Sequence, residues 1–245
     1  MNKRIKNKVV FITGGANGIG KATALLFSKD NKVIVIDNDE KACKELKEEN
    51  KEIEVYNEDI TNYNNIEKII DEIFNKYKNI DILINNAGIQ TIAPISKLTL
   101  KEWDEVLKVN LTSNFYITQL VSNRMKNDST ILNISSTHYN KPRVDHAHYD
   151  ISKSGIVTLT KLFAIELAPK KITVNSIAIG ATYTNMNKIF EENESVANIA
   201  KNKIPLKCIC NPEDIADSIY DVINDFSQKA TGSVFVIDGG RNITC

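Results

Sequence analysis

Tyr149 and Lys153 stand four residues apart near the start of a stretch with helical apolar spacing, so their side chains project from one face of the expected helix. The phenol of tyrosine normally titrates at about pH 10. A nearby ammonium stabilises the phenolate and lowers that pKa, which brings the phenol into the range of acid–base chemistry near neutral pH. The Y-x-x-x-K spacing alone is common by chance, so its meaning depends on the residues around it.

A glycine-rich turn supplies that context. The apolar run Val9–Thr13 leads directly into TGGANGIG, which opens a helical pattern. Glycines let the backbone turn tightly and approach a pyrophosphate, and the free N–H groups at a helix start attract its negative charge. The spacing is G-x-x-x-G-x-G, and its position between a strand and a helix predicts a dinucleotide-binding turn.

Asp37 ends the second apolar run, at about the distance expected for the acid that binds the adenosine ribose of NAD. A carboxylate there accepts hydrogen bonds from the 2′-OH and repels a 2′-phosphate. Asn38 follows it, and neither Arg nor Lys stands beside Gly18. The sequence therefore favours NAD as the cofactor, although a lysine from elsewhere in the fold could still admit NADP.

Seven short runs rich in Val and Ile alternate with longer helical patterns, and strands buried on both faces of a parallel sheet have this composition. The order predicts an α/β fold: a doubly wound Rossmann-type parallel sheet of about seven strands with helices on both faces, a three-layer sandwich. The predicted strands are 9–13, 33–37, 53–57, 82–85, 131–135, 172–177 and 233–238. The predicted helices are 18–29, 39–49, 64–77, 100–126, 149–168 and 212–226.

Residues 1–245 are expected to form one Rossmann-fold domain, because no Gly/Ser/Pro-rich linker divides the chain. Residues 181–210 form the one long connection without clear strand character. A connection of that length in a compact fold is usually functional, so we predict a lid over the substrate. Helical spacing of Met186, Ile189 and Phe190 suits such a flap, although ordinary packing against the body would give the same pattern.

Composition excludes several classes of function. Lys plus Arg and Asp plus Glu number 31 each, so the net charge is zero and no nucleic-acid partner is expected. No apolar stretch approaches the roughly 20 residues that span a bilayer, and the N-terminus lacks the apolar length of a signal peptide. We expect a cytoplasmic protein without a membrane partner.

Cysteines and histidines give no pattern of a disulfide framework or metal centre. The four cysteines lack a second pair at metal-ligand spacing, and the three histidines lack an accompanying H-E-x-x-H or similar motif. We therefore expect reduced thiols and no metal. These residues are Cys43, Cys208, Cys210, Cys245, His138, His146 and His148.

Together the motifs resemble the short-chain dehydrogenase/reductase family in its compact single-domain branch, and the resemblance extends from Val9 to Gly240. Besides the glycine turn, Tyr149 and Lys153, the matching motifs are Asp59, Asn85-Asn86-Ala87-Gly88, Asn110, Ile134-Ser135-Ser136, Val174-Asn175 and Asp238-Gly239-Gly240.

The resemblance implies a catalytic group of four residues. Tyr149 would be the general acid when a carbonyl is reduced and the general base when an alcohol is oxidised. Lys153 would lower the pKa of Tyr149 and bind the nicotinamide ribose. Ser136, thirteen residues before the tyrosine, would orient the substrate oxygen, and Asn110 would hold a water that relays protons from Lys153.

The resemblance also implies the cofactor contacts, which include Tyr149 and Lys153. The glycine turn would line the pyrophosphate, and later loops would contact adenine, the adenosine side and the carboxamide. The other implied contacts are Gly14, Asn17, Gly18, Ile19, Gly20, Asp37, Asp59, Ile60, Asn86, Ala87, Gly88, Gly180, Thr182 and Thr184.

Two departures from the family pattern fall near this site. Ile179-Gly180 replaces the usual Pro-Gly, and Thr182 stands where a small aliphatic residue is common. His138 and His148 are unusual polar neighbours that either read the substrate or are partly exposed loop residues. The expected substrate contacts are Ser136, His138, Tyr149 and Tyr183.

A homodimer or homotetramer is implied by the resemblance, with two helices of each chain in a four-helix contact. The apolar stripes that would form it are also what a monomer would bury in its core, and the sequence leaves both readings open. These stripes consist of Ile156, Leu159, Phe163, Leu167, Phe115 and Val121.

The leading hypothesis for function is an oxidoreductase that transfers a hydride between a nicotinamide cofactor and a carbonyl or secondary alcohol. The partner would be a small molecule, or a carbonyl on a larger one. A catalytically silent NAD(H)-sensing regulator on the same fold is the alternative, and dehydration or epimerisation chemistry is a third. The substrate itself stays open, because fold alone does not decide function.

Overall fold

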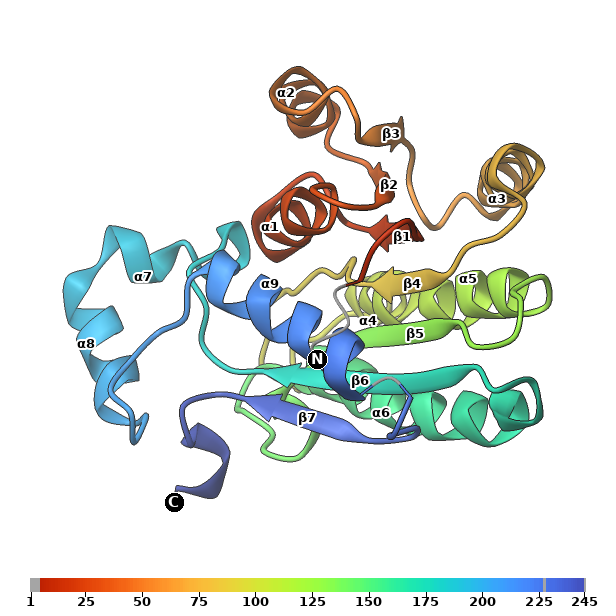
Figure 1. Ribbon diagram of the computed structural model, residues 1–245. Coiled ribbons are helices and arrows are strands. Elements are labelled where there is room, and N and C mark those ends of the chain that lie inside the picture. The colour runs from red at the N-terminus through yellow and green to blue at the C-terminus, as the bar shows by residue number, and fades with distance from the viewer. Residues whose placement is uncertain (1–4, 227, 245) are drawn as a thin grey trace.

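The structure, a computed structural model, describes residues 5–226 and 228–244. Within them, seven parallel strands form one sheet in the order β3-β2-β1-β4-β5-β6-β7. The α/β fold with a doubly wound parallel sheet is confirmed (Figure 1). The strands are β1 (Val9–Thr13), β2 (Lys32–Asp37), β3 (Glu54–Asn57), β4 (Ile82–Asn85), β5 (Thr130–Ser136), β6 (Thr173–Ile179) and β7 (Val234–Ile237).

Helices cover both faces of this sheet, so the three layers are present as well (Figure 1). One apolar cluster joins the strands to α1, α2 and α9, and a second joins them to α3, α5 and α6. The helices are α1 (Gly18–Phe27), α2 (Glu40–Glu49), α3 (Tyr63–Tyr77), α4 (Leu100–Leu107), α5 (Ser113–Ser122), α6 (Ala147–Leu167), α7 (Ile189–Glu192), α8 (Glu194–Asn202) and α9 (Pro212–Asp221).

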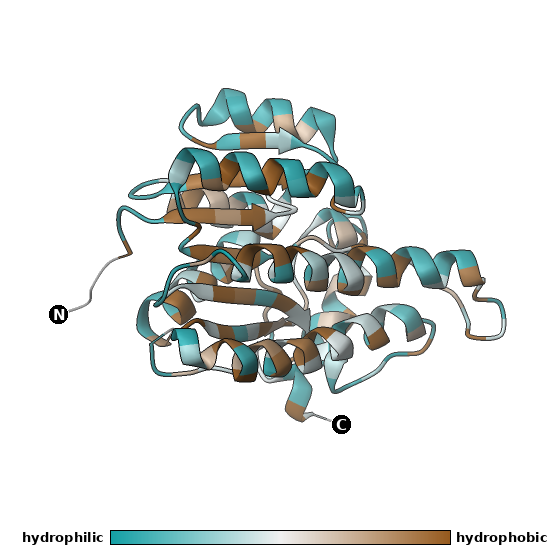
Figure 2. Cartoon of the chain, turned by 90° about the vertical axis from the view of Figure 1, so that its right-hand side faces the viewer, coloured by the Kyte–Doolittle hydropathy of each residue, from teal (hydrophilic) through white to brown (hydrophobic). Residues whose placement is uncertain are grey.

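The core follows from the two-residue period of the strands. Val10 and Ile12 of β1 face the α1 side, whereas Phe11 between them faces the α3 side. All three are fully buried. Figure 2 shows hydrophobic residues concentrated on the strands, with hydrophilic residues on the outer helix surfaces. The lack of polar alternation in the sequence is therefore explained by burial on both faces.

The side of the sheet to which successive strands are added changes between β1 and β4, although all strands stay parallel. The chain adds β2 and β3 on one side of β1 and adds β5, β6 and β7 beyond β4 on the other. Loops that follow β1 and β4 consequently leave in opposite directions, and a crevice opens at their carboxyl ends. Ligands of open α/β sheets bind at this place.

The long helix predicted over residues 100–126 is interrupted. It consists of α4, a π-helical turn η1 (Lys108–Thr112) and α5. Asn110 lies inside the π turn and is 1% exposed. A second π turn, η5 (Val222–Phe226), follows α9 within the range predicted as one helix. Single π turns are frequent at functional sites, because the extra residue re-aims a side chain.

Residues 181–210 leave the sheet and return to the same point. The Tyr183 N–H donates to the Cys210 carbonyl at 2.9 Å, and the Cys210 N–H donates to the Ala181 carbonyl at 3.1 Å. Between these ends, α7 and α8 project from the body beyond the carboxyl edge of the sheet (Figure 1). Ala197, Ile204 and Ile209 form a small apolar cluster of their own there.

The predicted apolar stripes divide between core and surface. Their larger part is buried within this chain: Ile156, Phe163, Leu167 and Val121. Leu159 is half-buried, and Phe115 is 40% exposed. The exposed apolar residues of α6 are instead Ile151, Leu162 and Ile165. Most of the stripe therefore belongs to the core, and a different face of α6 is open.

A buried polar ladder ties the central strands to the helices that carry the site. Asn85 Nδ2 of β4 donates to Asn133 Oδ1 of β5 and to Thr118 Oγ1 of α5, both at 2.9 Å. Asn133 Nδ2 donates to Thr160 Oγ1 of α6, also at 2.9 Å. Buried polar groups are costly unless paired, so this ladder fixes the position of both helices.

We expect Asn133→Ala to lower the free energy of unfolding by about 1–3 kcal/mol, because it leaves the buried Thr160 hydroxyl and Asn85 amide short of partners. Urea denaturation followed by circular dichroism measures this loss. Asn123→Ala, which removes the same atoms at an exposed position, is the control. Equal losses in both variants would contradict a structural role for the ladder.

Candidate functional site

A cavity of about 750 Å³ lies at the carboxyl edge of the sheet, where the crevice was expected. Loops after each of the seven strands line it, together with the start of α6 and the 181–210 segment. It brings together most of the residues predicted from the sequence: Gly14, Asn17, Gly18, Ile19, Asp37, Asp59, Ile60, Asn86, Ala87, Gly88, Ser136, His138, Tyr149, Lys153, Gly180, Thr182 and Thr184.

Three predicted residues lie outside the cavity lining: Gly20, Asn110 and Tyr183. A Cβ on Gly20 would lie 2.0 Å from the Gly14 carbonyl oxygen, so this glycine permits packing behind the turn. Tyr183 packs edge-on against Phe190, with ring centroids 6.4 Å apart, in the small cluster of the 181–210 segment. Gly20 was expected to contact the pyrophosphate and Tyr183 the substrate, and neither residue lines the cavity.

The turn between β1 and α1 needs glycine at defined positions. Gly14 and Gly18 adopt positive φ angles of 63° and 49°, which favour glycine. A Cβ on Gly14 would also lie 2.7 Å from the Ala87 Cα, so the β1 and β4 loops approach each other here. Asn86 secures this approach, since its Nδ2 donates to the Gly14 carbonyl at 2.7 Å.

The N-terminus of α1 is open to an anion. Asn17 is the N-cap residue, yet its side chain makes no capping hydrogen bond and instead donates to Asp39 Oδ2 at 3.0 Å. No acidic residue stands in the first turn of α1. The first N–H groups and the positive end of the helix dipole thus face the cavity without a competing carboxylate, as a pyrophosphate requires.

Acidic side chains gather at the adjoining end of the cavity. Asp37 accepts hydrogen bonds from the Ala16 N–H at 3.0 Å and the Asp39 N–H at 3.1 Å, which fix the direction of its carboxylate. Glu58 and Asp59 line the same end. Each carboxylate oxygen has a further lone pair for a ribose hydroxyl. The residues present therefore fit the adenosine half of a dinucleotide.

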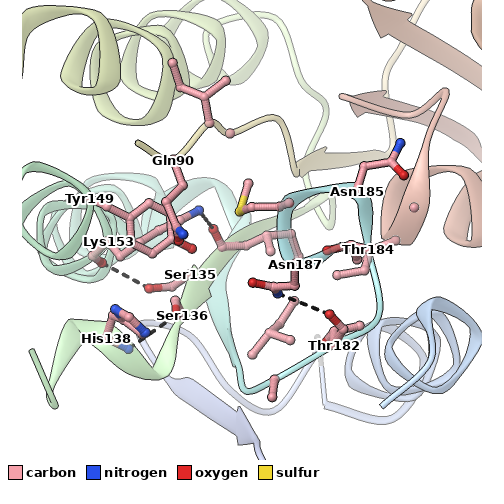
Figure 3. Close-up of a pocket in the computed structure, with 18 of the residues that line it drawn as sticks. Gln90, Ser135, Ser136, His138, Tyr149, Lys153, Thr182, Thr184, Asn185 and Asn187 are labelled. Atoms are coloured by element: carbon pink, nitrogen blue, oxygen red, sulfur yellow. Dashed lines mark hydrogen bonds between the residues drawn. The ribbon is translucent and has the colours of Figure 1, made fainter. Parts of the chain in front are cut away.

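Ser136, Tyr149 and Lys153 lie close together in the cavity lining (Figure 3). Ser136 is the last residue of β5, and the other two lie on the first turns of α6. The Ser136 hydroxyl accepts from the His138 N–H at 3.3 Å, so its own hydrogen is available to donate. The geometry unites the three groups that the spacing in sequence had linked.

The pKa values of this group are shifted by burial. Burial raises the pKa of Tyr149 to about 12, and a hydrogen bond with the Ser136 hydroxyl lowers it in part. Burial also lowers the pKa of Lys153 to about 8. The sequence led us to expect a lowered pKa for Tyr149, whereas in the structure this pKa is raised. The loss of water around the phenolate outweighs the stabilising hydrogen bond from Ser136.

Lys153 is held by the sheet. Its Nζ donates to the Ile134 carbonyl at 3.0 Å and lies 5.6 Å from the centroid of the Tyr149 ring. A Cβ on Gly88 would lie 3.5 Å from the same Nζ, so glycine at this position leaves the ammonium room. The residue is 4% exposed, so its charge depends on partners inside the protein.

Asn110 contributes through the loop after β4. Its Oδ1 accepts from the Ile89 N–H at 2.8 Å, and its Nδ2 donates to the Ile89 carbonyl at 2.9 Å and to Ser152 Oγ at 3.0 Å. This two-way bond to one backbone residue fixes the loop above Lys153. The side chain thereby positions the site from behind its lining.

The three histidines have different surroundings. His138 Nδ1 contacts Asp150 Oδ1 at 2.5 Å, and its ring stands edge-on to the Tyr149 ring with centroids 5.5 Å apart. Burial lowers the pKa of His138, while the Asp150 carboxylate opposes this shift. His148 is fully buried against Thr91, and burial lowers its pKa too. Of the two histidines suggested to read a substrate, only His138 lines the cavity.

Residues both behind the cavity and in its lining were missed from the sequence. Asp150 follows Tyr149 directly, is 4% exposed, and anchors both His138 and the Arg143 N–H. Its place beside the tyrosine was the available signal. Four basic residues line the cavity, Lys141, Arg143, Lys203 and Arg241, and nothing in their sequence context separates them from surface charges.

The described residues contain neither a cluster of metal-ligand side chains nor a helix that could span a membrane. No three His, Cys, Asp or Glu side chains within residues 5–226 and 228–244 are grouped as a metal site requires. Across the same residues, none of the helices has the length and apolarity to cross a membrane.

Comparisons with known proteins indicate the family of this chain. A family model described as enoyl-(acyl carrier protein) reductase matches residues 14–242. A 3-oxoacyl-[acyl-carrier-protein] reductase of Thermotoga maritima is 35% identical over 97% of this chain and 98% of its own length. Glucose 1-dehydrogenase 2 of Bacillus subtilis is 29% identical over 99% of this chain and 98% of its own.

Solved structures give the same result. A 3-ketoacyl-(acyl-carrier-protein) reductase from Brucella melitensis, complexed with NADH, superposes with a TM-score of 0.88 at 27% identity, over 97% of this chain and 99% of that one. A short-chain dehydrogenase/reductase from the same organism, described as a glucose/ribitol dehydrogenase, gives a TM-score of 0.91 at 25% identity, over 98% and 99%. From its sheet, its cavity and these relatives, the chain belongs to the short-chain dehydrogenase/reductase family of nicotinamide-dependent oxidoreductases.

Proposed function

We propose that this chain is an NAD-dependent dehydrogenase/reductase that interconverts a carbonyl and a secondary alcohol, with Tyr149 as general acid and base. The observation that carries the proposal is the meeting of Ser136, Tyr149 and Lys153 in the cavity that also holds the glycine turn. The nicotinamide cofactor, when bound, supplies or accepts the hydride. The chain's own residues handle the proton and the position of the substrate oxygen.

In the direction of carbonyl reduction, the Tyr149 phenol gives its proton to the substrate oxygen. A pKa raised to about 12 by burial keeps this phenol protonated at neutral pH, as a general acid must be. The Ser136 hydroxyl accepts the backbone N–H of His138 and keeps its own hydrogen, which it donates to the same oxygen. The Lys153 ammonium stabilises the phenolate that forms.

The acidic end of the cavity favours NAD over NADP. The lining there consists of Asp37, Asn38, Asp39, Glu58, Asp59 and Ile60, without a basic side chain. Nearby lysines are engaged elsewhere: Lys21 pairs with Glu49, and Lys41 pairs with Glu45. A 2′-phosphate would meet several carboxylates and no partner, which is unfavourable.

Asn110 is proposed as a positioning residue, acting through the Ile89 backbone. We also propose that Asn110 holds the water that relays protons from Lys153, as the family resemblance implies. We further propose that residues 181–210 serve as a lid, within one domain made of the whole chain. The bridge between Thr182 and Cys210 closes the base of that segment, so α7 and α8 can move as one flap.

A homodimer is proposed as the basic assembly, with the homotetramer as its extension. Residues of α6 and the neighbouring π turn leave an open apolar groove on the surface, and a second chain would cover it. The groove is lined by Leu111, Thr112, Phe115, Gly155, Thr158, Leu159 and Leu162. No observation favours a silent NAD(H)-sensing regulator, since the Ser136, Tyr149 and Lys153 group is intact and faces open space.

We expect Tyr149→Phe to lower kcat for carbonyl reduction by about 10²–10⁴-fold, because it removes the proton donor while keeping the ring. Steady-state kinetics on any carbonyl that the wild type reduces with NADH measure this loss, and NADH affinity by fluorescence should change little. Tyr139→Phe, on the short helix after β5, is the matched control. Retained turnover in Tyr149→Phe would refute the role given to the phenol.

The rate of carbonyl reduction should be level from about pH 6 to 8 and fall above about pH 8. Burial lowers the pKa of Lys153 to about 8, so the residue is charged below that pH and neutral above it. A neutral lysine no longer stabilises the forming phenolate. Lys153→Arg stays charged throughout and should reduce more slowly without that fall. A wild-type profile still level at pH 10 would argue against this assignment.

We expect the wild type to bind NADH at least about 100-fold more tightly than NADPH, and Asp37→Asn to narrow the ratio about tenfold, since the carboxylate charge is lost while an acceptor oxygen remains. Titration of cofactor fluorescence measures both constants. Asp104→Asn, at an exposed site on α4, controls for net charge. Tighter binding of NADPH by the wild type would overturn the role of Asp37.

A further inference from the structure

Charges in the cavity are separated by sign. The acidic residues, Asp37, Asp39, Glu58 and Asp59, all lie at the end assigned to adenosine. Four basic residues besides Lys153 line the other end, Lys141, Arg143, Lys203 and Arg241, and no carboxylate shares that part of the lining. None of the four forms an ion pair with a described carboxylate. Among residues 5–226 and 228–244, this end of the cavity therefore offers positive charge that no carboxylate pairs with.

The cationic groups of Lys141 and Arg241 both bind Thr244 near the C-terminus, and the backbone of Lys203 lies beside them. The Thr244 carbonyl accepts a hydrogen bond from Lys141 Nζ, and its Oγ1 accepts from Arg241 Nη1 at 3.1 Å. The same Oγ1 lies 3.4 Å from the Lys203 carbonyl, to which it can donate. The loop after β5, the end of α8 and the segment after β7 thus converge, although they are far apart in the sequence.

Arg143 connects this cluster to the reacting groups. Its Nη1 lies 3.4 Å from His138 Nε2, and the His138 ring stands edge-on to Tyr149. The Asp150 carboxylate lies beside them, but its two oxygens are engaged by His138 Nδ1 and the backbone N–H of Arg143. The Asp150 carboxylate therefore acts mainly on His138. The Arg143 guanidinium still has N–H groups that can donate to a ligand.

Apolar side chains of the 181–210 segment also line the cavity. They include Phe190, Ile199 and Ile204. These side chains suit a short hydrocarbon body, whereas the cations suit a charged terminus. Repelled from the acidic end and attracted to this one, an anionic molecule would enter in a single orientation.

We propose that the substrate of this site carries an anionic group, a carboxylate or a phosphate, which binds Arg143, Lys203 and their basic neighbours while its carbonyl meets Tyr149 and Ser136. This inference rests on the proposed function and adds the charge class of the substrate to it. Arg143 and Lys203 are the exposed members of the cluster, so they are the residues that reach an entering anion first.

Matched pairs of carbonyl compounds test the proposal. One arm compares 2-oxo and 3-oxo acids with their methyl esters, and the other compares phosphorylated ketones with the unphosphorylated forms. With NADH as reductant, the wild type should prefer the anion of a pair by at least about tenfold in kcat/KM, mainly through KM, and salt should weaken the preference. The arm with the larger ratio distinguishes carboxylate from phosphate.

In the double variant Arg143→Gln/Lys203→Gln, the ratio of kcat/KM for anion over neutral partner should fall about tenfold. Lys201→Gln, two residues from Lys203 and outside the cavity lining, should leave that ratio within about twofold of the wild type. Neutral partners reduced as well as the anions, or equal ratios in the double variant and the wild type, would overturn the inference and leave the proposed function standing.

Binding supplies a readout that does not need turnover. In a Tyr149→Phe background, where turnover is slow, the same oxo acids and phosphorylated ketones should quench NADH fluorescence at lower concentration than their neutral partners, and adding Arg143→Gln/Lys203→Gln should remove that difference. If no carbonyl is reduced by the wild type, the proposed function fails, while this titration still decides whether the basic end binds anions.

Discussion

The Tyr149 phenol and the Lys153 ammonium are both buried in the same part of the site. Burial raises the pKa of the phenol and lowers the pKa of the ammonium. It makes the phenolate costly and the ammonium costly, so each residue alone is driven toward its neutral form. Moving a proton off the phenol creates a charge pair in which each member offsets the cost of the other. The other residues of the site hold Tyr149 and Lys153 at a fixed separation, with the Ser136 hydroxyl beside them.

The fold supplies that precision through backbone and buried amides rather than through long side chains. β5 contributes the Ile134 carbonyl that holds Lys153 and ends on Ser136, while α6 carries both members of the pair. The Asn85–Asn133–Thr160 ladder ties that strand to that helix inside the core. Asn110 performs the same task for the loop above them. The change in the order of strand addition between β1 and β4 places the glycine turn next to Ser136, Tyr149 and Lys153.

Much of this could be predicted from the sequence, because the decisive signals are local. Unbroken Val and Ile runs indicated strands buried on both faces, and the predicted strand boundaries differ from the observed ones by few residues. The motifs around Gly14, Ser136 and Tyr149 each lie at a strand end or helix start, where topology alone brings them together. The π turn at Asn110 has no such signal, since one extra residue leaves the helical pattern unchanged.

What the sequence left undecided depends on tertiary packing. The pKa of Tyr149 follows from how much water is excluded, which the spacing to Lys153 does not report. α6 carries apolar residues on more than one side, so the buried Phe163 could not be told from the exposed Leu162. Likewise, Lys141, Arg143, Lys203 and Arg241 come from separate segments and each resembles a solvated surface charge until the fold gathers them.

The proposed mechanism requires the Lys153 ammonium and the Tyr149 phenol to interact across their shared pocket. Titration of ¹³C-labelled tyrosine by NMR, in the wild type and in Lys153→Met, measures this interaction. We expect a Tyr149 pKa well above the ordinary value of about 10 in the wild type, and higher by about one unit or more once the ammonium is removed. A Tyr149 pKa at the ordinary value, or one that is the same in both proteins, would contradict this mechanism.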